Sequence, residues 1–158
     1  MKNKVVIITG ATSGIGYACA RYFAQQGCHI VIAARNEEKL KRIGSELKSL
    51  YGNCLAVPTD VAIEAECKNL IQKTIETFGC IDILINNAGI SMRALLNDVS
   101  LNVMHQVMDI NFWGTVNCTK YALPYLLKSQ GSVVGVSSIA GKKGLPARCA
   151  YSASKFAM

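Results

Sequence analysis

Short apolar runs alternate along this chain with longer segments in which apolar and polar residues recur at helical spacing. The first run, residues 5–9 (VVIIT), is apolar at almost every position, as in a strand covered on both faces of a sheet. A glycine-rich turn follows it. Residues 15–26 then have the pattern of a helix that ends at Gly27.

The same alternation continues to the end of the chain. Asn36 is a good N-cap for the second predicted helix, which has glutamates in its first turn. Strands alternating with helices form βαβ units, and right-handed crossovers arrange such units as a doubly wound parallel sheet of the Rossmann type. We therefore predict one α/β domain over residues 1–158, with ligands beyond the carboxyl ends of its strands. Further strands are predicted at residues 28–34, 53–57, 81–85 and 132–136, and further helices at 37–50, 63–78, within 101–128 and from about Cys149.

Composition narrows the possible partners. With 51% hydrophobic and 17% charged residues, the chain has enough apolar side chains for a packed core. Its net charge of +7 is compatible with an anionic partner. The basic residues of segment 37–48 are, however, mixed with glutamates, as on a solvated helix face. Because no basic stripe is present, we expect no nucleic-acid partner.

The seven cysteines are widely spaced and never form a C-x-x-C pair. This pattern predicts neither a disulfide framework nor a zinc site, and no metal is expected. Free cysteines favour a reducing compartment. No signal peptide pattern precedes the first strand, and no apolar run approaches the roughly 18 residues that span a bilayer. We therefore expect a cytoplasmic protein without a membrane span.

Glycines in the turn after the first strand have the spacing G-x-x-x-G-x-G at Gly10, Gly14 and Gly16. Glycine allows a tight turn and lets backbone N–H groups approach a pyrophosphate at the positive end of a helix. The turn lies between a predicted buried strand and a predicted helix, which favours nucleotide binding over a purely structural turn. The other expected contacts of this segment are Thr12, Ser13 and Ile15.

Several motifs together resemble the short-chain dehydrogenase/reductase family, in its compact single-domain branch. The resemblance implies that Asp60 and Val61 lie at the adenine of a nicotinamide cofactor and that Asn87, Ala88 and Gly89 line it. The alternative for the two asparagines is a polar turn that bonds its own backbone. The motifs occur in family order at residues 9–16, Asp60-Val61, Asn86-Asn87-Ala88-Gly89, Asn111, Ser138 and residues 151–155 (YSASK).

The end of the second predicted strand bears on the choice of cofactor. An acidic residue there would hold the ribose 2′-hydroxyl of NAD, whereas an arginine accommodates the 2′-phosphate of NADP. This chain has Ala34 followed by Arg35, so NADP(H) is preferred and NAD(H) is the alternative. Two points weigh against this preference: Arg35 can also be a solvated loop residue, and Ser13 stands where some NADP-preferring relatives have a second basic residue.

Tyr151 and Lys155 are four residues apart and share one face of a predicted helix. A free tyrosine hydroxyl, with a pKa of about 10, is a poor base at neutral pH, and a nearby ammonium favours its phenolate form. The resemblance implies that Tyr151 is the catalytic acid and base, and that Ser138, rather than Ser137, hydrogen-bonds the substrate oxygen. It also implies that Asn111 holds a water that passes protons toward Lys155.

Family members continue beyond the equivalent of Met158 through two further strands, with helices that cover the substrate. We therefore expect that this chain is a C-terminally truncated part of an oxidoreductase that acts on a carbonyl or alcohol. The full-length protein is expected to be a homo-oligomer. The alternatives are a non-catalytic NAD(P)-binding regulatory module and an inactive fragment.

Overall fold

The computed structural model describes residues Met1–Met158, in which five strands alternate with helices as predicted. The elements are β1 (Val5–Thr9), α1 (Gly14–Gln25), β2 (His29–Ala34), α2 (Glu37–Tyr51), β3 (Cys54–Pro58), α3 (Glu64–Phe78), β4 (Ile83–Asn86), α4 (Leu101–Met108), a π-helical turn (Asp109–Trp113), α5 (Gly114–Ser129), β5 (Ser132–Gly135), a 3-10 turn (Ile139–Gly141) and α6 (Cys149–Ala157).

All five strands are parallel and lie in the order β3-β2-β1-β4-β5. The chain first builds outward from β1 to β3 and then crosses back to add β4 and β5 on the other side. The strand order therefore reverses between β1 and β4, and in such sheets this switch point opens a crevice at the carboxyl ends. The predicted doubly wound sheet is confirmed.

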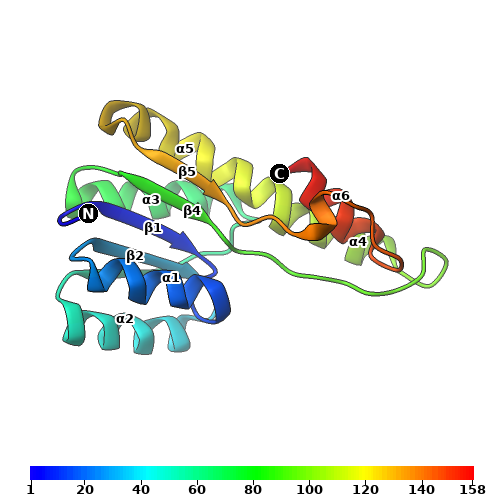
Figure 1. The fold of residues 1–158 in the computed structure, drawn as a ribbon, viewed down its shortest axis with the longest axis horizontal. Coiled ribbons are helices and arrows are strands. Elements are labelled where there is room, and N and C mark those ends of the chain that lie inside the picture. Colours follow the sequence, from blue (N-terminus) through cyan, green and yellow to red (C-terminus); the bar gives the residue numbers. More distant parts are fainter.

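Helices cover both faces of the sheet, with α1 and α2 on one side and α3 and α5 on the other (Figure 1). Because side chains alternate along a strand, β1 contributes to both cores. Val5 and Ile7 pack in the cluster that includes α3 and α5 residues, whereas Val6 and Ile8 pack in the cluster with α1 and α2. This double burial explains why the strand has an unbroken apolar sequence.

The edge strand β5 departs from this pattern. All four of its residues are exposed, and 45% of the surface of Val133 and 44% of that of Val134 remain accessible to solvent. β5 pairs only with β4, and α5 covers one of its faces. The prediction of a strand covered on both faces, made for residues 5–9, is therefore confirmed for β1, whereas β5 is exposed.

The helical stretch predicted within residues 101–128 is interrupted by the π-helical turn Asp109–Trp113, which separates α4 from α5. Helix α4, this turn and α6 pack together beyond the carboxyl ends of the strands (Figure 1). The predicted N-cap of α2 is confirmed, because the Asn36 side chain accepts a 2.8 Å hydrogen bond from the Lys39 amide. None of the helices combines the length and the apolar character that crossing a membrane requires.

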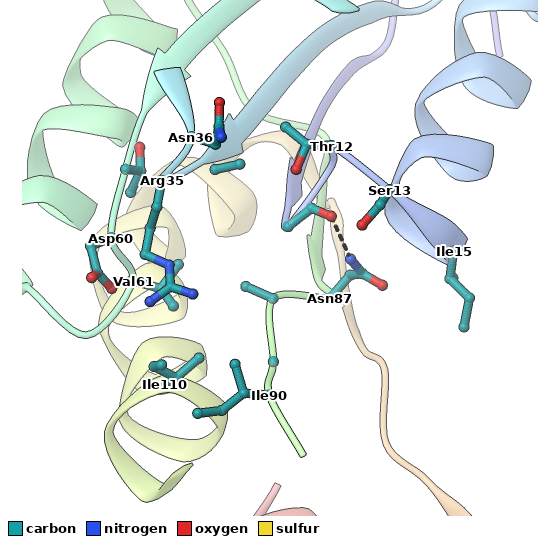
Figure 2. A pocket seen from close by; sticks show the side chains of 15 residues that line it. Thr12, Ser13, Ile15, Arg35, Asn36, Asp60, Val61, Asn87, Ile90 and Ile110 are labelled. Carbon is teal, nitrogen blue, oxygen red and sulfur yellow. Dashed lines mark hydrogen bonds between the residues drawn. The ribbon is translucent and has the colours of Figure 1, made fainter. Parts of the chain in front are cut away.

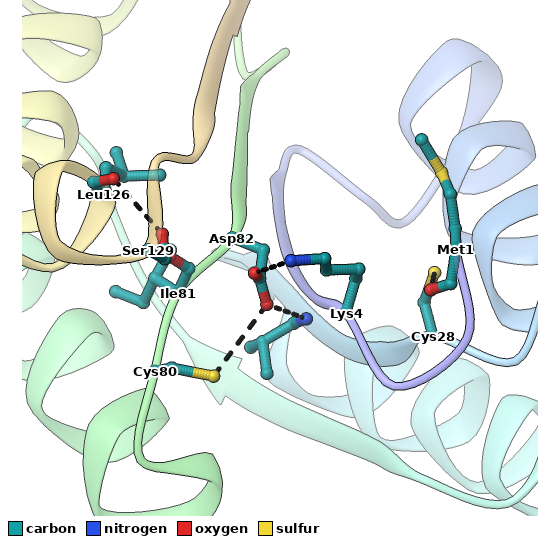
Figure 3. A network of polar contacts seen from close by, with 9 residues as sticks. Met1, Lys4, Cys28, Cys80, Ile81, Asp82, Leu126 and Ser129 are labelled. Atoms are coloured by element: carbon teal, nitrogen blue, oxygen red, sulfur yellow. Dashed lines mark hydrogen bonds and ion pairs between the residues drawn. The ribbon is translucent and has the colours of Figure 1, made fainter.

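At the opposite, amino-terminal end of the sheet, Asp82 joins β1 to the segment that enters β4 (Figure 3). Its carboxylate accepts hydrogen bonds from the Lys4 ammonium at 2.6 Å and from the Val5 amide at 2.9 Å. Burial alone would raise the pKa of Asp82, but these two donors outweigh it and hold that pKa below its usual range. Asp82 thus fixes the start of the central strand.

Candidate active site

The turn after β1 is closed by contacts with the segment after β4. The buried Thr9 hydroxyl accepts hydrogen bonds from the amides of Asn87 and Ala88, both at 3.0 Å. Gly10 has a φ of +65°, and a Cβ there would lie 2.8 Å from the Cα of Ala88. Both the conformation and the close approach therefore require glycine at this position.

Asn87 reaches from the second segment into the first. Its side-chain amide donates to the carbonyl oxygens of Thr9 at 2.9 Å and Gly10 at 3.2 Å. A Cβ on Gly16 would collide with this amide and with the Gly10 carbonyl. Asn87 does bond backbone, as the polar-turn alternative proposed, but the backbone belongs to the glycine turn rather than to its own segment.

A cavity of about 710 Å³ opens beside this turn (Figure 2). Its volume lies in the range of about 300–1,000 Å³ that is typical of ligand pockets. Helix α1 begins there, and the Ser13 side chain caps none of its first-turn amides. An uncapped helix N-terminus favours an anion. The lining residues are Gly10, Thr12, Ser13, Ile15, Ala34, Arg35, Asn36, Thr59, Asp60, Val61, Asn87, Ala88, Gly89, Ile90 and Ile110.

Arg35 and Asp60 line the side of this cavity that is formed by the ends of β2 and β3, and Figure 2 shows the Arg35 side chain beside Asp60 and Val61. No carboxylate lies within ion-pairing distance of Arg35. The Asp60 carboxylate accepts a 3.1 Å hydrogen bond from the Ala62 amide, and the Asp60 amide donates to Glu66 at 2.6 Å. Asp60 is thus held by its own loop and by the first turn of α3, whereas the Arg35 guanidinium has no hydrogen-bond or ion-pair partner in the protein.

A second cavity of about 230 Å³ contains Tyr151, Lys155 and Ser137. Residues of the glycine turn and of the segment after β4 border both cavities, so the two cavities adjoin. Lys155 is only 6% exposed, and its ammonium donates a 2.7 Å hydrogen bond to the Val136 carbonyl. Burial lowers the pKa of Lys155. The shared lining residues are Ile15, Asn87, Gly89 and Ile90.

Asn111 and Ser138 border neither cavity. The fully buried Asn111 side chain accepts from the Ile90 amide at 2.8 Å and donates to the Ile90 carbonyl and the Ser154 hydroxyl, both at 2.9 Å. The Ser138 hydroxyl accepts a 3.2 Å bond from the Ala140 amide and so begins the 3-10 turn. Of the predicted catalytic residues, the structure brings Tyr151 and Lys155 together in one cavity. Gly14 and Gly16 shape the turn without lining either cavity.

Sequence reasoning missed several lining residues that lie just after strands. Thr59 follows β3, Ile90 follows β4, and Val136 follows β5. Their signal was available, because ligands bind beyond the carboxyl ends of parallel strands. Ile110 had no such signal, since it belongs to the π-helical turn.

The sequence of this chain matches a known protein family over almost its whole length. The model of the short chain dehydrogenase family matches residues 4–158. The chain is 40% identical to 11-beta-hydroxysteroid dehydrogenase-like 3 of Arabidopsis thaliana, over 99% of this chain and 51% of the relative. It is 42% identical to dehydrogenase/reductase SDR family member 7B of Bos taurus, over 99% of this chain and 50% of the relative. The chain thus spans about half the length of the curated relatives it matches.

Two solved structures have the same fold. An alcohol dehydrogenase from Thermococcus sibiricus, complexed with 5-hydroxy-NADP, superposes with a TM-score of 0.96 and 29% identity, over 99% of this chain and 67% of that one. A short chain dehydrogenase/reductase from Burkholderia phymatum, in complex with NAD, gives 0.95 and 32%, over 99% of this chain and 56% of that one.

Proposed function

Because this chain belongs to the short-chain dehydrogenase family, we propose that the protein is an oxidoreductase that transfers hydride between NADP(H) and a carbonyl or alcohol substrate. The observation that carries the proposal is the position of Tyr151 and Lys155, which share a cavity that adjoins the nucleotide-sized cavity. A phenol beside a buried ammonium has little use in a purely nucleotide-binding module. We therefore favour catalysis over the regulatory alternative.

The residues around the larger cavity fit a dinucleotide. The glycine turn and the uncapped start of α1 suit a pyrophosphate, since backbone N–H groups and the helix dipole both attract anions. Ile15 is 61% exposed at this point and offers an apolar surface beside the entrance to the smaller cavity. When bound, a nicotinamide cofactor donates or accepts the hydride.

The protein's own groups handle the proton. During carbonyl reduction, the Tyr151 hydroxyl donates its proton to the carbonyl oxygen, and in the reverse direction the phenolate accepts it. Lys155 is proposed to contribute a positive charge in the same cavity as this hydroxyl. Ser138 is proposed to hold the substrate oxygen, and Asn111 to support the proton path toward Lys155 from its fixed place beside Ile90.

Two finer proposals concern selectivity. Arg35 has no acidic partner and borders the larger cavity, so it is available to bind a 2′-phosphate through its planar set of donors. One of the similar proteins is named for hydroxysteroids. We therefore propose NADP(H) as the preferred cofactor and a lipophilic carbonyl or alcohol as the substrate class.

The test combines binding with turnover. Purified protein is titrated with NADPH and NADH, and NADPH oxidation is then followed with a panel of lipophilic ketones and aldehydes. We expect Tyr151→Phe to bind NADPH normally and to lose about 10²–10⁴-fold in kcat, which is the usual contribution of a general acid.

Tyr22→Phe is the matched control, because Tyr22 is 57% exposed on α1, away from both cavities. Its kcat should equal that of the wild type. Cofactor binding without turnover in the wild type would favour the regulatory alternative. Unchanged turnover in Tyr151→Phe would refute the assignment of Tyr151.

A further inference from the structure

Two loops that flank the smaller cavity are joined by two direct contacts. The Ala94 amide, in the segment after β4, donates a 2.9 Å hydrogen bond to the Ala147 carbonyl, just before α6. The Arg148 guanidinium donates to the Ser91 hydroxyl and lies over the Tyr151 ring, 5.7 Å from its centroid. Ser91 and Tyr151 both line the cavity, so Arg148 connects two of its walls.

The backbone holds Arg148 at a fixed point. Its amide donates to the Leu145 carbonyl at 3.2 Å, and its carbonyl accepts the first helical bond of α6 from the Ser152 amide at 2.7 Å. The preceding Ala147 has a φ of +57°, a left-handed conformation that non-glycine residues rarely adopt. The Arg148 side chain therefore projects from a hydrogen-bonded turn of fixed conformation.

The partners of Arg148 are unusual for a cation, since no carboxylate lies within ion-pairing distance. Its contacts are a neutral hydroxyl and an aromatic face. Arginine suits both at once, because its planar guanidinium stacks on a ring while its edge donates hydrogen bonds. Lysine, with a compact ammonium, cannot reproduce this double contact.

We propose that Arg148 is a positioning residue: it holds the segment that contains Ser91 next to the ring of the proton-donating Tyr151, on two sides of the smaller cavity. The proposal rests on the function proposed above, in which Tyr151 is the acid and base. None of the contacts of Arg148 involves a residue that lines the larger cavity. Its loss should therefore affect the carbonyl substrate and leave the affinity for NADPH unchanged.

A double-mutant cycle tests this connection. Arg148→Met keeps the length and apolar stem of the side chain without its donors, and Ser91→Ala removes the acceptor. Each variant should lower kcat/KM for the carbonyl substrate about tenfold, mainly through KM, as expected for one hydrogen bond to a charged group. The double variant should be no worse than Arg148→Met alone, because that variant already lacks the contact with Ser91. Arg148→Lys keeps one cationic donor and should recover part of the loss.

Arg93→Met is the matched control, since Arg93 is an exposed arginine in the same segment as Ser91 and makes no hydrogen bond or ion pair. Its kinetics should not change. If the losses in the Arg148→Met and Ser91→Ala variants multiply in the double variant, the two residues act separately and the proposal is wrong.

Amide hydrogen exchange gives a readout that needs no turnover. Arg148→Met and Ser91→Ala should speed the exchange of residues 91–97, with Ala94 included, whereas Arg93→Met should not. Unchanged exchange would overturn the proposed contact even in an active enzyme. If the two variants exchange faster but the wild type turns over no carbonyl, the contact between the two loops is supported and the proposed function is refuted. The failure of one proposal can therefore be distinguished from the failure of the other.

Discussion

At the scale of single residues, the proposed preference for NADP(H) rests on Arg35, whose side chain has no acidic partner in the protein. It follows Ala34 at the end of β2, borders the larger cavity and has no carboxylate to neutralise it. A 2′-phosphate would supply the missing charge. NADH, which lacks that phosphate, gains nothing from the guanidinium.

We expect Arg35→Ser to weaken NADPH binding by about 10–100-fold, as for the loss of hydrogen bonds to a charged group. The affinity for NADH should stay within about twofold, because the 2′-hydroxyl does not depend on the cation. Fluorescence titration with each cofactor measures both constants. Arg42→Ser, on the exposed side of α2, is the control. A parallel loss for both cofactors would show that Arg35 has another role.

At the scale of elements, the π-helical turn Asp109–Trp113 leads directly into α5 and contributes Ile110 to the larger cavity. Hydrophobic periodicity predicts helix through the whole region but does not resolve the one extra residue of a π turn. Such turns occur often at functional sites. Here the turn carries Asn111, and directly after it Gly114 packs against Val61, a lining residue of the larger cavity.

Gly114→Ala tests this packing. An added Cβ would lie 2.6 Å from Val61 Cγ2 and 2.9 Å from Val61 Cβ. Val61 has little freedom to move, because its carbonyl accepts bonds from Cys67 and Asn117. We expect the free energy of unfolding to fall by about 1–2 kcal/mol from overpacking, with weaker NADPH binding. Denaturant unfolding and titration measure the two effects.

Gly144→Ala serves as the comparison, since nothing lies within 4 Å of a Cβ at that position. It should leave the free energy of unfolding and the NADPH affinity at wild-type values. Equal stability of the Gly114→Ala variant and the wild type would mean that α5 shifts away from Val61 at no cost.

At the scale of the whole molecule, Asp82 links folding stability to pH. Its pKa is lowered in the folded protein by Lys4 and the Val5 amide, which outweigh the opposing effect of burial. A carboxyl whose folded pKa lies below its unfolded value of about 3.9 stabilises the fold above that value. The stabilisation is lost as pH falls through the folded pKa.

We therefore expect Asp82→Ala to lower the free energy of unfolding at pH 7 by about 1–3 kcal/mol, because the buried Val5 amide loses its partner. The difference from the wild type should shrink as the pH is lowered below about 4. Urea unfolding at a series of pH values measures it. Asp98→Asn, in an exposed loop, should leave the wild-type profile intact. A difference that is constant with pH would rule out the carboxylate charge as the cause.

Some features of the whole molecule can be predicted from its sequence, and others cannot. The strands, their order of alternation with helices and the glycine turn follow from local patterns, because a doubly buried strand such as β1 must be apolar throughout. That Tyr151 and Lys155 share one helix face follows from their spacing, whereas their proposed role follows only from the family resemblance. The bonds of Asn111 to Ile90 and of Arg148 to Ser91 join residues far apart in sequence, and they depend on loop conformations that no periodicity encodes.

The hydrogen bonds of Asp82 with Lys4 and Val5 lie at one end of the parallel strands, and the two cavities lie at the other end. This arrangement gives protein engineering, and natural variation, two independent regions to modify. Substitutions that strengthen the contacts of Asp82 with Lys4 and Val5 would raise the free energy of unfolding. They would offset destabilising changes in the loops around the cavities and alter none of the residues that line those cavities. The parallel sheet thus allows the loops around the cavities to vary while the contacts at its amino-terminal end are preserved.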